Sequence, residues 1–223
     1  MENEEKTREI VVPGEKIASG DECLPGEGTK REGKDILAIR YGVVSEEGRM
    51  FKVIPLSGIY YPRAGNVIIA AVRDIVFNGW MMDINAPYGG FLSVMECPRF
   101  FDRNDLSEHM GIGDAIACKI YSVKRKGVDV TIKGRGLGKL EDGLIIKINS
   151  NKVPRVIGKE GTMINLIKEK TGCNIVVGQN GIVWISGRNI EEELKAKEAI
   201  LFITEKSFVD GLTEQVNHLL EKK

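Results

Sequence analysis

The segment from Leu144 to Lys206 constrains the fold of this 223-residue chain more than any other part of the sequence. Its apolar pattern alternates between the two-residue repeat of strands and the repeat of about 3.6 residues that is typical of helices. A strand is expected at Leu144–Ile148, and two apolar helical stretches follow it on either side of the segment Gly158–Gly161. Glycine adopts backbone angles that other residues avoid, so it allows a sharp turn. The sequence therefore predicts two short helices here, at Val153–Ile157 and Thr162–Thr171, instead of one long helix.

Further signals complete a six-element order. Strands are expected at Asn174–Val177 and Ile182–Ile185, and Asn180-Gly181 between them is a frequent hairpin-turn pair. A long helix over Asn189–Lys206 follows, with Asn189 as the expected N-cap. The order β-α-α-β-β-α, with a glycine-x-x-glycine turn between its first two helices, resembles the type I KH domain.

The resemblance to KH domains implies an RNA-binding turn. Gly158 and Gly161 let the backbone approach a phosphate, and the N–H groups at the start of the next helix face anionic oxygens. Lys159 adds a cation and Arg155 precedes the turn. KH domains clamp about four nucleotides at such a turn. Glu160 cancels the charge of Lys159, so the turn is expected to bind RNA weakly or mainly to hold its shape.

Residues 63–136 form a second, β-rich pattern. Five strands and a short helical insert are expected: Val67–Val72, Gly79–Ile84, Phe91–Met95, the insert Asp102–His109, Ala115–Val123 and Val128–Lys133. This order resembles the S-one-type RNA-binding domain, which is a five-stranded OB-type barrel. Phe77 and Trp80 fall on the two aromatic positions of that family, where rings can stack on bases. Ser93 stands where the family often has histidine, and Trp80 can equally be a core or interface residue.

Basic side chains are concentrated in this second pattern, although the whole chain is neutral, with 32 Lys and Arg against 32 Asp and Glu. Between Lys119 and Lys139 there are seven basic residues and one acid, Asp129. A local positive surface attracts RNA to a groove or pore. The candidate phosphate contacts are Arg73, Arg99, Arg103, Lys124, Arg125, Lys126 and Arg135. For any one cluster, a solvated strand face is the alternative interpretation.

The first 62 residues are expected to form a small β domain, with strands at Asp35–Val44 and Arg49–Pro55 and a glycine-rich loop at Gly20–Gly33. A β domain followed by an OB-type barrel and one KH domain resembles the archaeal exosome cap subunits known as the ribosomal-RNA-processing protein four family. The likeness runs from about Ile10 to Phe208. The blocks that carry it are Val11–Gly14, Trp80–Pro87, Gly136–Leu140, Lys152–Lys159 and Val177–Gly181.

The resemblance to the exosome cap subunits implies a multidomain protein without catalytic activity, divided at residues 1–62, 63–136 and 137–223. In that family three copies form a cap on a hexameric ring of RNase PH-like subunits. The N-terminal domain grips the ring, and the barrels surround the entry pore for single-stranded RNA. The ring degrades RNA from its 3′ end by phosphorolysis. The resemblance therefore implies RNA and the ring as partners, no cofactor and a cytoplasmic location.

Other classes of function find little support in the sequence. The segment Gly134–Lys139 lacks the spacing of a Walker loop. The four cysteines are too far apart for a CxxC metal motif, and neither histidine has a nearby ligand-type partner. No apolar run approaches the ~20 residues that cross a membrane. Two alternatives remain: a stand-alone RNA-binding transcription or translation factor, and an enzyme with its own nuclease activity.

Overall fold

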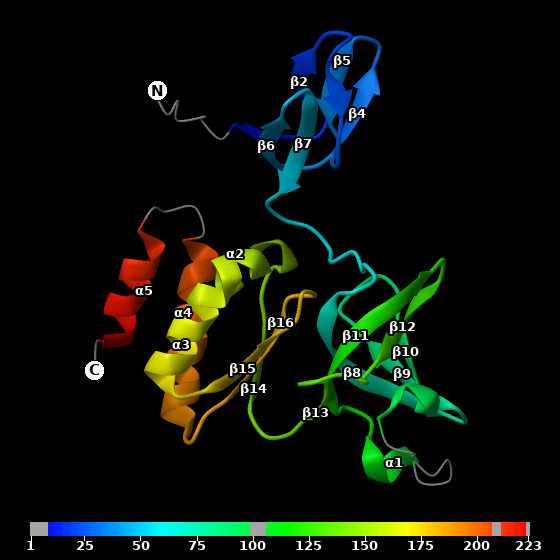
Figure 1. Cartoon of the computed structure of the whole chain (residues 1–223), viewed down its shortest axis with the longest axis vertical. Helices are drawn as coiled ribbons and strands as arrows, with labels where there is room; N and C mark the ends of the chain where they lie inside the picture. Colours follow the sequence, from blue (N-terminus) through cyan, green and yellow to red (C-terminus); the bar gives the residue numbers. More distant parts are fainter. Residues whose placement is uncertain (1–8, 99–105, 207–210, 222–223) are drawn as a thin grey trace. The chain divides into compact units, whose positions relative to one another are not determined.

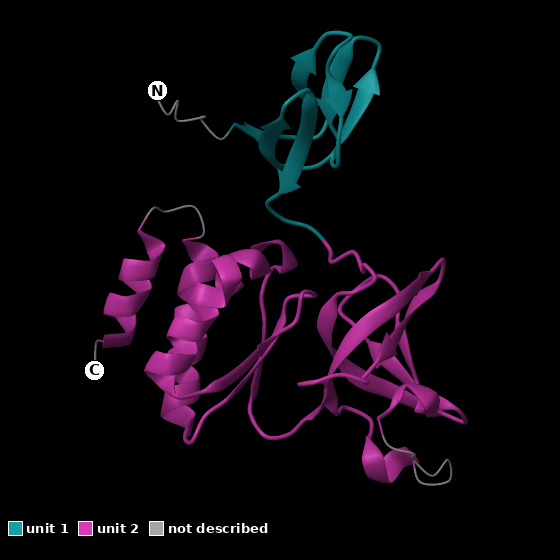
Figure 2. Cartoon of the chain, in the orientation of Figure 1, with its two compact units in different colours: residues 1–58 teal, residues 59–223 magenta. Residues whose placement is uncertain are grey.

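The computed structural model describes residues 9–98, 106–206 and 211–221 (Figure 1). It divides the chain into two compact units, residues 1–58 and 59–223 (Figure 2). The second unit holds both the barrel and the KH domain, so the predicted division into three domains stays a prediction. No helix within the described ranges is long and apolar enough to span a membrane.

Unit 1 consists of two small sheets, with strand orders β1-β6-β7-β3 and β2-β5-β4. The strands are β1 Ile10–Val11, β2 Lys16–Ser19, β3 Leu24–Pro25, β4 Thr29–Glu32, β5 Asp35–Ala38, β6 Gly42–Glu47 and β7 Met50–Pro55. Among the described residues of this unit, Val11, Ala38 and Val53 form the buried core cluster, and Cys23, Ile36 and Val43 are also buried. The unit therefore encloses little apolar surface of its own.

Two predictions for unit 1 are wrong in detail. The single strand expected over Asp35–Val44 is interrupted between β5 and β6, which belong to different sheets. The loop expected over Gly20–Gly33 contains β3 and β4, and the Thr29 hydroxyl donates to the Phe51 carbonyl oxygen at 3.1 Å. Such short strands are held by backbone pairing and single side-chain hydrogen bonds. Their sequences therefore lack the alternating apolar pattern that predicts a strand.

The barrel of unit 2 has five strands that close on themselves, as predicted. The sheet order is β12-β10-β9-β8-β11-β13, and β12 also pairs with β11. The bounds are β8 Val67–Val76, β9 Gly79–Asp83, β10 Gly90–Ser93, β11 Ala115–Lys124 and β12 Gly127–Thr131. A 3-10 turn at Val94–Glu96 and helix α1, Leu106–His109, lie between β10 and β11. The core contains the inward residues of every strand, among them Ile68, Trp80, Leu92, Ile116 and Val130.

A sixth strand, β13 at Gly138–Leu140, was not expected. The sequence predicts a glycine-rich linker over Gly134–Gly143, but β13 pairs antiparallel with β11 at the edge of the barrel sheet. Lys139 on this strand makes an ion pair with Asp114, with Nζ 2.7 Å from Oδ2. An edge strand needs backbone groups more than apolar side chains, so its composition resembles that of a linker.

The KH domain has the predicted order. Its elements are β14 Leu144–Lys147, α2 Val153–Ile157, α3 Thr162–Thr171, β15 Asn174–Val177, β16 Ile182–Ser186 and α4 Ile190–Glu205, followed by α5 Leu212–Glu221. The sheet order is β14-β16-β15, and the helices lie on one face of this sheet (Figure 1). A separate apolar core joins sheet and helices through residues such as Val156, Ile167, Ile185 and Ile200.

The hairpin between β15 and β16 holds the KH domain to the barrel. Asn180 at its turn has an exposure of 0%. Its Oδ1 accepts from the Ile69 backbone N–H at 3.3 Å, and its Nδ2 donates to the carbonyl oxygens of Ile69 at 2.7 Å and Ile84 at 2.9 Å. Asn85 Nδ2 donates to the Asn180 carbonyl oxygen at 2.9 Å. These bonds satisfy every polar atom of a buried amide, so barrel and KH domain form one packed body.

Candidate nucleic-acid interface

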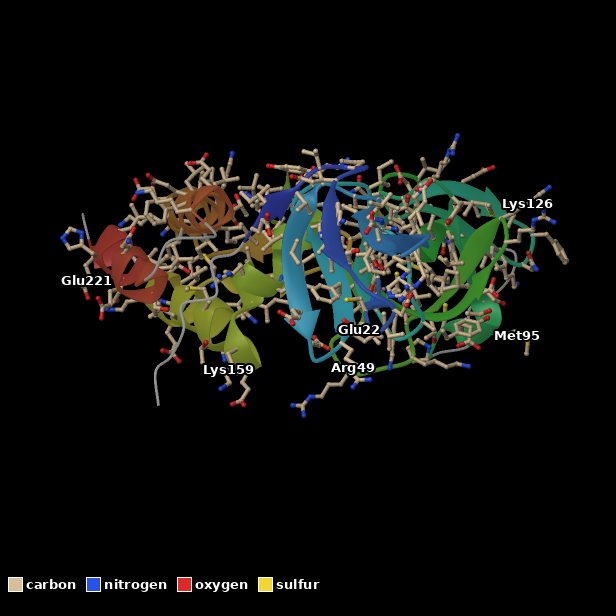
Figure 3. The ribbon with its side chains drawn as sticks, turned by 90° about the horizontal axis from the view of Figure 1, so that it is seen from above. Glu22, Arg49, Met95, Lys126, Lys159 and Glu221 are labelled. Carbon is tan, nitrogen blue, oxygen red and sulfur yellow. The ribbon has the colours of Figure 1, made fainter. Side chains whose placement is uncertain are left out.

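The turn between α2 and α3 has the conformation that its glycines allow. Gly158 and Gly161 have φ angles of 76° and 81°, and Glu160 between them has a φ of 55°. A Cβ at position 158 would lie 2.7 Å from the Met163 backbone nitrogen. The turn is therefore packed directly against the start of α3. Arg155 and Lys159 are exposed beside it, and Lys159 projects from the ribbon in Figure 3.

Gly158→Ala is expected to lower the free energy of unfolding of unit 2 by about 2–3 kcal/mol, because the new methyl group would clash with the Met163 backbone nitrogen and residue 158 also has a positive φ of 76°. Gly161→Ala is the control. Its added Cβ would meet only side chains, the nearest at 3.6 Å, and it bears about 1–2 kcal/mol of left-handed backbone strain. Urea denaturation of both variants measures the difference. Equal losses would contradict the close packing at position 158.

Phe77 lies where an aromatic ring can meet RNA. It occupies the turn between β8 and β9, where Val76 pairs with Gly79, and its exposure is 80%. Met95 is also exposed and lies on the neighbouring turn, since the Val94 N–H donates to the Asn78 carbonyl oxygen at 3.0 Å. Exposed rings stack on bases with a gain of about 1–3 kcal/mol each. Phe77 therefore keeps its predicted role as a candidate.

Trp80 does not lie where a base can reach it. Its exposure is 0%, it belongs to the barrel core, and its Nε1 donates to the Met110 carbonyl oxygen at 3.0 Å. Alternation along β9 points Trp80 and Met82 inward and Met81 outward. The predicted stacking role of Trp80 is therefore corrected to a core role.

The predicted phosphate contacts separate into three groups. Arg73, Arg125, Lys126 and Arg135 are exposed and form no ion pair with another residue in the described ranges. Lys124 instead pairs with Asp129, with Nζ 2.6 Å from Oδ2, and this hydrogen bond raises the pKa of Lys124. Arg99 and Arg103 lie outside the described residues.

Of these four exposed cations, the structure brings Arg125 and Lys126 together on one turn. Arg125 and Lys126 occupy the turn between β11 and β12, at the edge of the barrel where Figure 3 labels Lys126. Arg73 is the extra residue of a β-bulge in β8, and Arg135 follows β12. The turn of β11 and β12 is thus the most concentrated uncompensated positive charge among these candidates.

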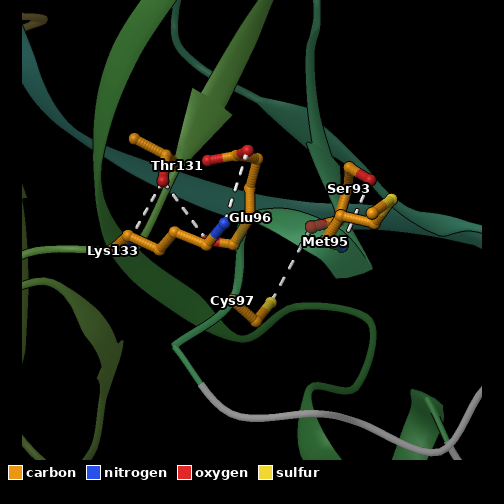
Figure 4. A network of polar contacts seen from close by, with 6 residues as sticks. All are labelled: Ser93, Met95, Glu96, Cys97, Thr131 and Lys133. Atoms are coloured by element: carbon orange, nitrogen blue, oxygen red, sulfur yellow. Dashed lines mark hydrogen bonds and ion pairs between the residues drawn. The ribbon is translucent and has the colours of Figure 1, made fainter.

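A network of polar contacts, including an ion pair, lies at the other end of β12 from this turn (Figure 4). The Thr131 hydroxyl donates to the Glu96 backbone carbonyl oxygen at 3.3 Å, and Lys133 Nζ lies 3.6 Å from the Glu96 carboxylate. Because Lys133 is compensated in this way, it offers less to a phosphate than the unpaired cations do. The network joins the 3-10 turn after β10 to the end of β12.

Within the described residues, the structure shows neither a metal-binding cluster nor a reactive cysteine. No set of three His, Cys, Asp or Glu side chains within the described ranges could hold a metal ion. All four cysteines are free and buried. Burial raises the pKa of Cys118 to about 12 and that of Cys97 to about 11, so both remain protonated thiols near neutral pH.

Known proteins resemble the chain over nearly all of its length. The KH domain family model matches residues 143–202. "Exosome complex component Rrp4" of Methanothermobacter thermautotrophicus is 42% identical over 216 residues, which cover 96% of this chain and 68% of the relative. The protein of the same name from Pyrococcus furiosus is 41% identical over 224 residues, covering 98% and 84%. A crystal structure of a candidate exosome complex RNA-binding protein is 34% identical, with a TM-score of 0.67, covering 74% and 96%.

Proposed function

The chain belongs to the Rrp4 family of exosome complex components, and from this premise we propose that it is a non-catalytic, RNA-binding cap subunit of an archaeal exosome. It recruits single-stranded RNA and threads it into a ring of RNase PH-like subunits, which degrades the RNA from the 3′ end by phosphorolysis. The observation that carries this proposal is the packed body of an OB-type barrel and a KH domain, with the unpaired cations Arg125 and Lys126 on one barrel turn.

The barrel makes the main RNA contacts in this proposal. Arg125, Lys126, Arg73 and Arg135 neutralise phosphates, and Phe77 stacks on a passing base. Arg99 and Arg103 remain predicted contacts. The turn at Gly158–Gly161 adds a second, weaker contact, because Glu160 offsets the charge of Lys159. Three copies in one cap raise the overall affinity by avidity.

Unit 1 is the proposed attachment to the ring. Ile10, Val43 and Ile54 are paired in register across β1, β6 and β7, so their side chains share the sheet face opposite Val53. Ile10 and Ile54 are more than half exposed. Leu24 and Met50 form a second exposed apolar pair on the same face, separated from Ile54 by Ser45 and Lys52. An apolar sheet face on a unit with such a small core favours a protein partner over water.

Removing the two turn cations together, Arg125→Ala with Lys126→Ala, is expected to weaken the binding of a single-stranded RNA about tenfold at low salt. The slope of log K against log salt concentration is expected to fall in magnitude by about 1.4, since each single-strand phosphate contact contributes about 0.7. Fluorescence anisotropy across a salt series measures both quantities. Arg188→Ala with Lys195→Ala, two exposed cations near the start of α4, is the control. An unchanged slope in the turn variant would remove these residues from the interface.

Co-purification with RNase PH-like ring subunits, followed by RNA decay with and without this chain, tests the proposed function. The expected result is a stable complex whose RNA decay is faster than that of the ring alone. Recovery of polymerase or ribosomes without ring subunits would favour the stand-alone factor. Shortening of RNA by the purified chain would favour an enzyme.

A further inference from the structure

Asp129 is a buried carboxylate that the proposed RNA contacts leave unused. It is the one acid in the basic run from Lys119 to Lys139, and its exposure is 8%. Its neighbours Val128 and Val130 point into the barrel core. Asp129 therefore points to the outer face of β12, where a carboxylate with so little exposure is unusual.

Aromatic side chains lie on the strands that flank this carboxylate. β12 pairs with β10 on one side, and Phe91 is the register partner of Asp129. Met81 on β9 is the register partner of Phe91, and Asp74 on β8 is that of Met81. Asp74, Met81, Phe91 and Asp129 thus form one row across the outer face of four strands. The face of the second and third strands is the usual oligonucleotide surface of OB folds.

A β-bulge brings Tyr121 to the other side of Asp129. In β11, Ile120 pairs with Val130 and Ser122 pairs with Asp129, so Tyr121 is the extra residue. Bulges re-aim side chains next to functional sites. The Tyr121 side chain is about half exposed. Desolvation and then the negative charge of Asp129 raise the pKa of the Tyr121 hydroxyl, which agrees with the closeness of the two groups.

One carboxylate oxygen of Asp129 makes an ion pair, and the other can still accept a hydrogen bond. Oδ2 lies 2.6 Å from Lys124 Nζ, whereas Oδ1 has no hydrogen-bond partner within the described ranges. A carboxylate that is ionised can only accept hydrogen bonds. A base edge that reaches Oδ1 must therefore present a donor, and a base edge that presents an oxygen is repelled.

We propose that Phe91, Tyr121 and Asp129 form a nucleobase site that prefers bases with an exocyclic amino group. The rings of Phe91 and Tyr121 contact the base, and Asp129 Oδ1 accepts from its amino group. Cytosine and uracil have nearly the same size, but cytosine presents an N4 amino donor where uracil presents the O4 acceptor. The site therefore favours cytidine over uridine. This inference rests on the proposed RNA-binding function and adds base selectivity to it.

The test compares 12-nucleotide oligo(rC) and oligo(rU) by fluorescence anisotropy with the full chain. We expect wild type to bind oligo(rC) about tenfold more tightly than oligo(rU). In Asp129→Asn the ratio is expected to fall towards one, because an amide can both donate and accept. Asp74→Asn is the matched control, since Asp74 lies in the same row two strands beyond Phe91 and should leave the ratio unchanged.

Lys124→Gln tests whether Asp129 contacts the base or only makes an ion pair with Lys124. If Asp129 only anchors Lys124, then Lys124→Gln and Asp129→Asn will change both affinities alike and leave the ratio intact, which would overturn the inference. If Asp129 reads the base, Lys124→Gln keeps the preference for oligo(rC). Equal binding of the two oligonucleotides by wild type would also overturn the base site while leaving the cap function in place. Absence of all RNA binding would overturn both.

Discussion

Asn180→Ala is expected to lower the free energy of unfolding of unit 2 by at least about 3 kcal/mol. The substitution removes the bonds to the Ile69 N–H, the Ile69 carbonyl and the Ile84 carbonyl, all of which lie at a fully buried amide. A buried polar group without its partner costs about 1–3 kcal/mol. Urea denaturation followed by circular dichroism measures the loss. Because Asn180 joins two cores, we also expect the single transition to separate into a barrel step and a KH step.

Gln179→Ala is the control for this substitution. Gln179 is the preceding residue of the same turn, its side chain is exposed, and its backbone N–H donates to the Val67 carbonyl oxygen at 2.9 Å. Alanine keeps that backbone bond, so the change is expected to stay within about 0.5 kcal/mol. If Asn180→Ala proved as stable as Gln179→Ala, the buried amide would not be what holds the barrel and the KH domain together.

The KH domain could be predicted closely because its local signals agree with its tertiary packing. The bounds of α2, α3 and β15 are those expected from the sequence. Helix α3 ends before Gly172, which has a φ of 71°, and Asn189 caps α4 by accepting from the Glu192 N–H at 2.9 Å. Each of these features depends on residues within about one helical turn, so a single sequence contains the information.

The features that the sequence could not supply depend on distant residues or on strand register. The sequence Asn180-Gly181 predicts a hairpin turn, which the structure confirms. The hydrogen bonds of the Asn180 side chain to Ile69 and Ile84 could not be predicted, because they join residues that are 111 and 96 positions apart. The aromatic pattern predicts a stacking role for Trp80 with a core position as the alternative, whereas in β9 Trp80 is buried and Met81 is exposed; a shift of one residue reverses every side chain of a strand. The bulge at Tyr121 likewise has no sequence signal, although the lone acid Asp129 in a basic run could have marked this face.

Ile54→Asp is expected to weaken the proposed attachment of unit 1 to the exosome ring by about 100-fold or more. Ile54 lies on the apolar face of β7, with an exposure of 56%, and pairs with Val43. An unpaired charge buried in an interface costs about 3–5 kcal/mol, which corresponds to a factor of roughly 10² to 4 × 10³ in affinity. Size-exclusion chromatography or biolayer interferometry with purified ring subunits measures the loss. The core residue Val53 points to the other face, so circular dichroism should show unit 1 still folded.

Ile190→Asp provides the comparison, because Ile190 on α4 is 73% exposed and belongs to unit 2. Both substitutions replace an exposed isoleucine with aspartate, so a general loss of surface apolarity would affect them alike. Ring binding that disappears with Ile54→Asp and survives with Ile190→Asp places the attachment on the β1-β6-β7 face. The reverse result would assign the attachment to the KH domain. The exposed apolar residues of unit 1 would then indicate a different protein partner, because they lie outside the small core of this unit.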